Sequence, residues 1–259
     1  MPQSFDPDFG LTADDYGRHR AGFPPELLIR LTARGVGLPG QTVLDVGTGT
    51  GSLARLFAQA GADVTGIDPA EPLLGQAREL DRAAGVKIDY RTGTAEDTGM
   101  PDRSFDVVSA GQCWHWFDAP KAGIEIRRLL RPGGRVVIAH FDWLPLPGNL
   151  ITATEELITR YNPAWSMGGG TGLYPRWLTD LATAGFTGIE TFSFDLDVPY
   201  TPQAWIGRIR ASAGVGASLP DEAVNRFSDE LSRVIADRFP GDVLHLPHRT
   251  WAVVAQPND

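Results

Sequence analysis

Three glycines at alternate positions, Gly47, Gly49 and Gly51, follow a short apolar run and lead directly into a helical pattern. Asp45 stands two residues before the first of them. Glycines at this spacing let backbone N–H groups approach a ligand closely at the point where a strand turns into a helix. The pattern therefore predicts a binding site for a nucleotide-like cofactor.

The surrounding residues narrow the choice of ligand. A dinucleotide fingerprint requires G-x-G-x-x-G, and the third glycine position of that pattern is occupied here by Ser52. The carboxylate of Asp45 suits a ligand that carries positive charge and suits a pyrophosphate poorly, because like charges repel. Asp68 ends the next predicted strand, where a carboxylate can accept hydrogen bonds from both hydroxyls of a ribose.

Strands and helices alternate along the first 142 residues. Short apolar runs predict strands at 42–46, 63–68, 86–91, 105–110 and 135–141. Helical patterns between them occupy 52–60 and 71–84, and a further helix ends at 124–130. This alternation predicts a parallel sheet with helices on both faces, so the polar groups meet at the carboxyl edge of the sheet.

The regular alternation of strands and helices ends after residue 142, where the chain becomes rich in Trp, Pro and Gly. The patterns predict helices and strands, in chain order, at 150–161, 177–184, 189–198, 201–213, 221–239 and 250–255. We interpret 1–259 as one domain with a sheet core at 24–142, 173–199 and 247–256. The expected additions are an N-terminal lid at 1–23 and cap elements at 143–172 and 200–246, the natural places for substrate-specific structure.

Composition excludes several classes of protein. The chain has 259 residues, 42% of them hydrophobic, and 32 acidic against 23 basic residues give a net charge of −9. An acidic chain is a poor partner for nucleic acid or an anionic membrane, and no run reaches the ~18 apolar residues of a membrane span. Residues 1–6 lack a secretion-signal pattern, and the single cysteine leaves no disulfide framework. We therefore expect a cytoplasmic protein of undetermined oligomeric state.

Several motifs together resemble class I S-adenosylmethionine-dependent methyltransferases. The segment 45–51 is similar to motif I of that family, Asp68 to its ribose-binding acid, and 93–97 to the loop that flanks adenine. The segments 105–108 and 112–118 are similar to motif IV, with the His-Trp-Phe-Asp ending of the small-molecule "type 11" subgroup, which includes trans-aconitate-methyltransferase-like enzymes. Residues 129–134 match the turn before the fifth strand, and 16–25 resemble the subgroup's leader.

This resemblance is specific over residues 11–142 and loose beyond them. It implies a Rossmann-like α/β fold with a seven-stranded, mostly parallel sheet whose last strand is antiparallel. It also implies S-adenosylmethionine as cofactor, with S-adenosylhomocysteine as product. No metal is expected, since no carboxylate or histidine completes a ligand pattern around His245 and His248. By this resemblance the cofactor-binding residues are Tyr16, Arg20, Asp45, Gly47, Thr48, Gly49, Gly51, Asp68, Pro69, Ala95, Glu96 and Gln112.

Two histidines are candidates for a catalytic base. His115 follows the fourth predicted strand and His140 ends the fifth, so both belong to the ligand edge of the sheet. Asp142 lies two residues after His140 and is a candidate to orient it. The alternative for His115 is a packing role between Trp114 and Trp116. Asp118 precedes Ala119-Pro120 and is expected to cap a helix.

Residues in the added regions are candidates for binding the acceptor. Aromatic side chains usually pack in a core, but several of them in these regions are equally consistent with contact to a flat or apolar substrate. Arg208 either meets an anionic group or lies on a solvated face. The predicted substrate-binding residues are Trp116, Trp143, Tyr161, Trp165 and Arg208.

These features predict methyl transfer from S-adenosylmethionine to an oxygen or nitrogen of a small-molecule acceptor. The cofactor supplies a strong leaving group, so the protein chiefly aligns the acceptor, and a base is needed only when the acceptor must lose a proton. One alternative is a carboxylate acceptor held by Arg208, which needs no base. Another is a protein of the same fold with a non-methylating activity such as cyclisation. A nicotinamide oxidoreductase is the weakest hypothesis, because the third glycine of the dinucleotide pattern is missing and Asp45 is present.

Overall fold

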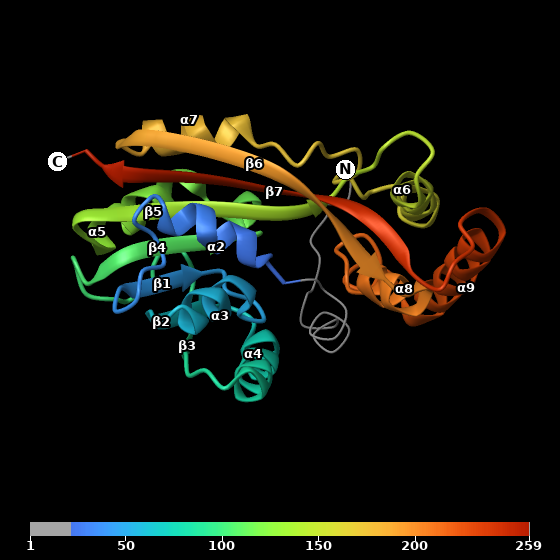
Figure 1. Cartoon of the computed structure of the whole chain (residues 1–259), viewed down its shortest axis with the longest axis horizontal. Helices are drawn as coiled ribbons and strands as arrows, with labels where there is room; N and C mark the ends of the chain where they lie inside the picture. The colour runs from blue at the N-terminus through green and yellow to red at the C-terminus, as the bar shows by residue number, and fades with distance from the viewer. Residues whose placement is uncertain (1–21, 259) are drawn as a thin grey trace. The chain divides into compact units, whose positions relative to one another are not determined.

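The computed structural model describes residues 22–258, which contain a seven-stranded sheet in the order β3-β2-β1-β4-β5-β7-β6. Strands β1 to β5 pair in parallel, and β7 runs opposite to its neighbours (Figure 1). This confirms the expected Rossmann-like α/β fold. The strands are β1 Thr42–Val46, β2 Asp63–Asp68, β3 Asp89–Thr92, β4 Phe105–Gly111, β5 Leu130–Trp143, β6 Phe186–Tyr200 and β7 Leu244–Pro257.

Most helices begin and end close to the predicted bounds, because their apolar stripes and caps are local features of the sequence. The larger shifts are in strands, since β7 begins at Leu244 and β5 at Leu130, both earlier than expected, and β3 begins at Asp89, later than expected. The helices are α2 Pro25–Thr32, α3 Ser52–Gln59, α4 Glu71–Ala84, the short η2 Trp114–Trp116, α5 Ala119–Leu129, α6 Leu150–Tyr161, α7 Pro175–Thr183, α8 Pro202–Arg210 and α9 Asp221–Arg238.

The chain divides into two compact units. The described part of the sheet unit comprises residues 22–141, 173–194 and 250–258, and that of the helical unit comprises 142–172 and 195–249. Within the helical unit α6, α8 and α9 pack around buried Trp205, Phe227 and Leu231. Among the described residues, those predicted to bind the cofactor all fall in the sheet unit.

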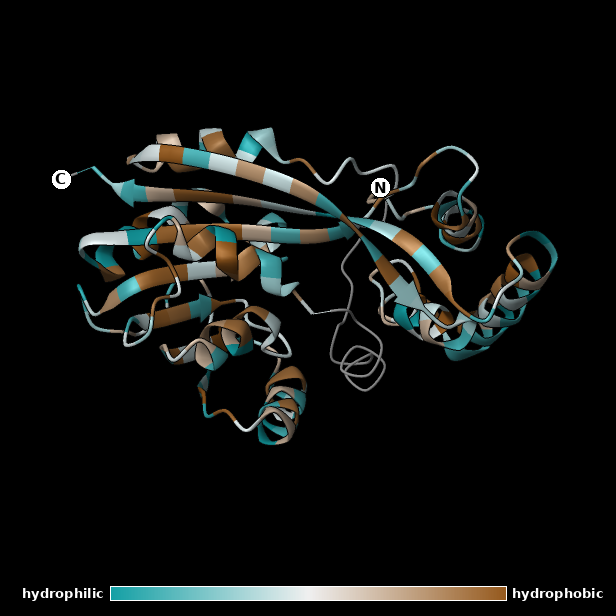
Figure 2. Ribbon diagram, in the orientation of Figure 1, coloured by the Kyte–Doolittle hydropathy of each residue, from teal (hydrophilic) through white to brown (hydrophobic). Residues whose placement is uncertain are grey.

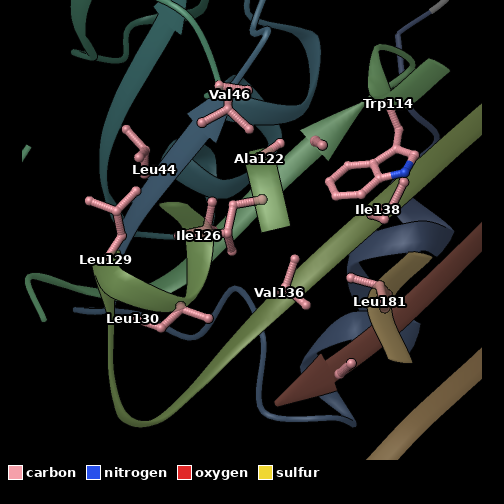
Figure 3. Close-up of a cluster of buried hydrophobic side chains, with 14 of the residues drawn as sticks. Leu44, Val46, Trp114, Ala122, Ile126, Leu129, Leu130, Val136, Ile138 and Leu181 are labelled. Atoms are coloured by element: carbon pink, nitrogen blue, oxygen red, sulfur yellow. The ribbon is translucent and has the colours of Figure 1, made fainter. Parts of the chain in front are cut away.

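One face of the sheet carries a large apolar core. Leu44 and Val46 of β1 pack with Val136 and Ile138 of β5 and with Ile126 of α5, all fully buried (Figure 3). Alternation along β1 sends Val43 and Asp45 to the opposite face. At the sheet edge, β6 instead alternates hydrophobic and hydrophilic residues along its length (Figure 2).

The expected turn at 131–134 lies inside β5 rather than before it. Phe105 pairs with Leu130, but Val107 already pairs with Arg135, so a bulge of residues on β5 faces a single residue on β4. Pro132 and two glycines make such an interruption compatible with continued pairing. The strand therefore starts five residues earlier than the apolar run suggested.

Candidate active site

The glycine turn connects β1 to α3 at the carboxyl edge of the sheet. Gly49 has φ +56°, a conformation that L side chains rarely adopt, and a Cβ placed on it would meet nothing within 4 Å. Gly51 has no such freedom, because a Cβ there would lie 2.1 Å from the hydroxyl of Tyr90. The turn is thus packed on its inner side and open beside Gly49, as a close backbone approach to a ligand requires.

Asp45 connects the turn to β4 by hydrogen bonds. Its side chain is fully buried, and it accepts hydrogen bonds from Thr48 Oγ1 at 2.7 Å and from Ser109 Oγ at 2.6 Å. Burial raises the pKa of this carboxyl to about 6. Ser109 reaches Asp45 because the two residues pair across β1 and β4. No sequence motif pointed to Ser109, although a hydroxyl within an apolar strand was a usable signal.

Asp68 holds the other side of the turn. Its Oδ2 accepts from the backbone N–H of Gly49 at 2.8 Å, and its Oδ1 accepts from that of Ala70 at 2.9 Å. The side chain is 7% exposed, and burial raises its pKa. Asp45, on β1, and Asp68, at the end of β2, thereby fix the same turn.

The segments expected around the adenine lie at the same edge. Ala95 is buried, Pro69 is exposed, and the half-buried Glu96 accepts at Oε1 from the backbone N–H of Asp118 at 2.9 Å. Asp118 accepts in turn from the N–H of Lys121, which confirms it as the N-cap of α5. Glu96 therefore ties the loop after β3 to the start of α5.

Gln112 follows β4 with φ +60°, which is unusual for a residue with a side chain. Its backbone N–H donates to the carbonyl of Ala139 at 2.9 Å, and its side-chain amide donates to the carbonyl of Phe141. Cys113, the next residue, is buried against Gly47 and donates to the carbonyl of Val46. The strained residue is held by β5 at the ligand edge.

The two candidate histidines belong to one aromatic cluster of the sheet unit. The rings of His115 and His140 lie 5.4 Å apart, centroid to centroid. His140 packs against Tyr174 at 4.5 Å and Trp177 at 4.7 Å, and these two rings stack on each other at 3.8 Å. His140 is only 3% exposed, whereas His115 is exposed beside Trp116. Tyr174 was not among the sequence candidates.

The predicted acceptor residues have mixed positions. Trp116 is 42% exposed in the sheet unit. Trp165 is buried in the core of the helical unit, and the half-buried Trp143 and Tyr161 pack against that core. Arg208 is 9% exposed, and its Cζ lies 4.8 Å from the centre of the Trp143 ring. A solvated face for Arg208 is therefore wrong, because α8 turns that side of the helix inward.

Two further predictions lie outside what the structure describes, since Tyr16 and Arg20 fall in residues 1–21. Among residues 22–258 no three or more His, Cys, Asp or Glu side chains gather as a metal site would require. In the same range no helix combines the length and apolar character needed to cross a membrane.

Comparison with known proteins agrees with this geometry. Residues 44–138 match the family model described as "Methyltransferase domain". An uncharacterized methyltransferase of Mycobacterium tuberculosis is 38% identical over 128 residues, 49% of each chain. A ubiquinone biosynthesis O-methyltransferase of Pseudomonas paraeruginosa is 44% identical over 112 residues, 42% of this chain and 48% of that protein. The chain thus spans about half the length of the curated relatives it matches.

Solved structures share the fold. Phosphoethanolamine N-methyltransferase 2 of Haemonchus contortus, in complex with phosphomonomethylethanolamine and S-adenosylhomocysteine, aligns with TM-score 0.56 at 21% identity over 96% of this chain and 57% of that one. A [4+2]-cyclase aligns with TM-score 0.56 at 22% identity over 93% and 85% of the two chains. At such identities the likeness concerns the fold alone.

Residues 44–138 therefore match a methyltransferase domain, and the resemblance of the sequence motifs implies S-adenosylmethionine as the cofactor. The residues present fit this cofactor. Gly49 leaves open space beside the turn, and two buried carboxylates suit a ligand that carries a sulfonium and an ammonium group. Whether Asp45 and Asp68 touch it directly stays a prediction.

The open side of Gly49 yields a first prediction. We expect Gly49→Ala to raise the Kd for S-adenosylhomocysteine about tenfold or more, because the new methyl group enters the ligand's space. Gly85→Ala is the matched control, since Gly85 also has positive φ (+68°) and open space around it. Both changes cost roughly 1–2 kcal/mol of stability through backbone strain. Isothermal titration calorimetry checks this, and equal Kd values for the two variants would contradict it.

The raised pKa of Asp45 yields a second prediction. In the unfolded chain this carboxyl ionises near pH 4, but in the folded protein near pH 6, so its contribution to stability is complete below about pH 4 and lost as pH rises through about 6. Relative to Asp45→Asn, the wild type is expected to lose roughly 2–3 kcal/mol between pH 4 and 7. Urea unfolding at several pH values measures the difference.

Asp106 is the control for this series. Partial burial raises the pKa of Asp106, but hydrogen bonds from the Thr42 N–H and from Arg131 outweigh it, so the pKa is lowered. Asp106→Asn should therefore show a dependence of opposite sign, with the wild type losing stability as pH falls. If the difference in unfolding free energy between the wild type and Asp45→Asn did not change with pH, the raised pKa of the buried Asp45 carboxyl would be refuted.

Proposed function

We propose that the chain transfers the methyl group of S-adenosylmethionine to an oxygen or nitrogen of a small-molecule acceptor. The observation that carries this proposal is the glycine turn, open beside Gly49 and held by Asp45 and Asp68, within a matched methyltransferase domain. The bound cofactor supplies an activated methyl group on a sulfonium, which is a good leaving group. The protein's own task is to hold donor and acceptor in line and to exclude water.

In this proposal the turn receives the amino-acid end of the cofactor and Asp68 receives the ribose. Asp68 already accepts one hydrogen bond at each oxygen, from Gly49 and Ala70, and each oxygen has a second lone pair. Ala95 and Glu96 border the adenine, and Gln112 lies toward the amino-acid end. Tyr16 and Arg20 are proposed to complete the site.

His115 is the proposed base, and His140 its support. A base must come within hydrogen-bond distance of the acceptor's proton, and only His115 of the pair has an exposed ring. His140 is enclosed by Tyr174 and Trp177 and lies against His115. An enclosed ring of this kind fixes the position of its neighbour.

A carboxylate acceptor is the second candidate, favoured by Arg208. A guanidinium buried on the face of Trp143 is a strong feature for holding an anion, because burial strengthens its field. Such an acceptor is already ionised at neutral pH and needs no base. A non-methylating reaction such as cyclisation has support only from the shared fold with the cyclase.

The direct test is release of S-adenosylhomocysteine. The purified chain is incubated with methyl-labelled S-adenosylmethionine and a panel of small phenols, amines and carboxylic acids. We expect label in the product of one class, with an equal amount of S-adenosylhomocysteine formed. Binding of S-adenosylhomocysteine without label transfer to any of them, together with turnover of a polyene substrate, would point to cyclisation instead.

The two histidines give a prediction that separates the acceptors. For an acceptor that must lose a proton, His115→Gln should lower kcat about 100-fold or more, the usual contribution of a positioned base. His140→Gln should lower it less and should also lower Tm, since it empties part of a packed cluster. His245→Gln, an exposed histidine of β7, is the control.

Full turnover in both His115→Gln and His140→Gln would contradict a base. In that case a carboxylate acceptor is expected, and Arg208→Lys should then raise the KM for it. A larger kcat loss for His140→Gln than for His115→Gln would reverse the two assigned roles.

A further inference from the structure

Arg55, on α3, connects the glycine turn to the helix behind it. Its Nη2 donates to the carbonyl of Thr50 at 2.8 Å and to that of Ala77 on α4 at 3.3 Å. Its Nε donates to Asp81 Oδ1 at 2.7 Å. A single guanidinium, with its donors in a fixed planar arrangement, thus joins the turn, α3 and α4.

This ion pair differs from the others of the sheet unit in its burial. The side chains of Arg55 and Asp81 are 15% and 5% exposed, whereas those of Arg91 and Asp89 are 55% and 57% exposed. Exposed pairs contribute little and hold little in place. The buried Arg55–Asp81 pair also binds the backbone carbonyl of Thr50, so it holds that carbonyl in one position.

Tyr90 closes the same cluster from β3. Burial and the neighbouring Asp81 carboxylate raise the pKa of its hydroxyl, so Tyr90 stays protonated at any ordinary pH. A Cβ at Gly51 would stand 2.1 Å from this hydroxyl and 3.2 Å from Arg55 Nη2. The inner side of the turn therefore rests directly on Tyr90 and Arg55.

We propose that Arg55 and Asp81 are positioning residues for the amino-acid end of the cofactor. They touch no proposed ligand group, and they act by fixing Thr50 and Gly51, which sets the open side of the turn at Gly49. This inference rests on the proposed function, since it takes the turn as the place where that end of the cofactor binds. It predicts selectivity: ligands with the amino-acid tail depend on Arg55 and Asp81, and ligands without it do not.

The test compares two ligands on matched variants. S-adenosylhomocysteine carries the tail, and 5′-methylthioadenosine keeps the adenosine and thioether but lacks it. For Asp81→Asn we expect the Kd of S-adenosylhomocysteine to rise about tenfold, as for residues that orient a binding group without touching the ligand, and that of 5′-methylthioadenosine to change less than about twofold. Asp89→Asn makes the same chemical change in an exposed pair and should alter neither Kd.

Arg55→Lys is the second variant, in case Asp81→Asn folds poorly. It keeps the charge beside Asp81 but cannot make all three hydrogen bonds, so an intermediate loss confined to S-adenosylhomocysteine is expected. Equal losses for both ligands, or no loss in either variant, would overturn the positioning role. A wild-type chain that binds neither ligand would instead refute the proposed function, so the two failures are distinguishable.

Discussion

Two buried carboxylates, those of Asp45 and Asp68, accept hydrogen bonds within and around the turn after β1. Burying an anion is costly unless its oxygens are satisfied, so each carboxylate requires specific donors in specific places. For Asp45 these are the hydroxyls of Thr48 and Ser109, and for Asp68 the backbone N–H groups of Gly49 and Ala70. The pairing of β1 with β4 and the path of the chain after β2 bring these donors to the two carboxylates.

The strand order makes the turn the natural binding point. From β1 the chain builds outward through β2 to β3 and then returns to place β4 on the other side of β1. Connections on the two sides of this switch point leave in opposite directions, which opens a crevice at the carboxyl edge. Because the buried carboxylates of Asp45 and Asp68 lie at the turn, a ligand with positive charge is favoured there. The same geometry with a basic residue at position 45 would favour a phosphate.

Much of this arrangement was predictable from local patterns. Strand β1, the glycine turn, Asp68 and the cap at Asp118 are each encoded by adjacent residues, and all were found in the sequence. Ser109, Tyr90 and Tyr174 were missed because their roles depend on partners far along the chain. Burial of Arg208 was missed for the same reason: periodicity shows which side of a helix is apolar, not what covers it.

The site of the methyl donor can be predicted from local sequence motifs, whereas the site of the acceptor cannot. Apart from Tyr16 and Arg20, the residues predicted to bind the cofactor all lie within residues 44–138, the segment that matches the methyltransferase family model. The helical unit is held by contacts among large aromatic and aliphatic side chains that any well-packed core needs, so its sequence carries little sign of a ligand. Within this unit Arg208 packs its guanidinium over the Trp143 ring, so burial alone does not separate an arginine that holds a ligand from one that belongs to the core.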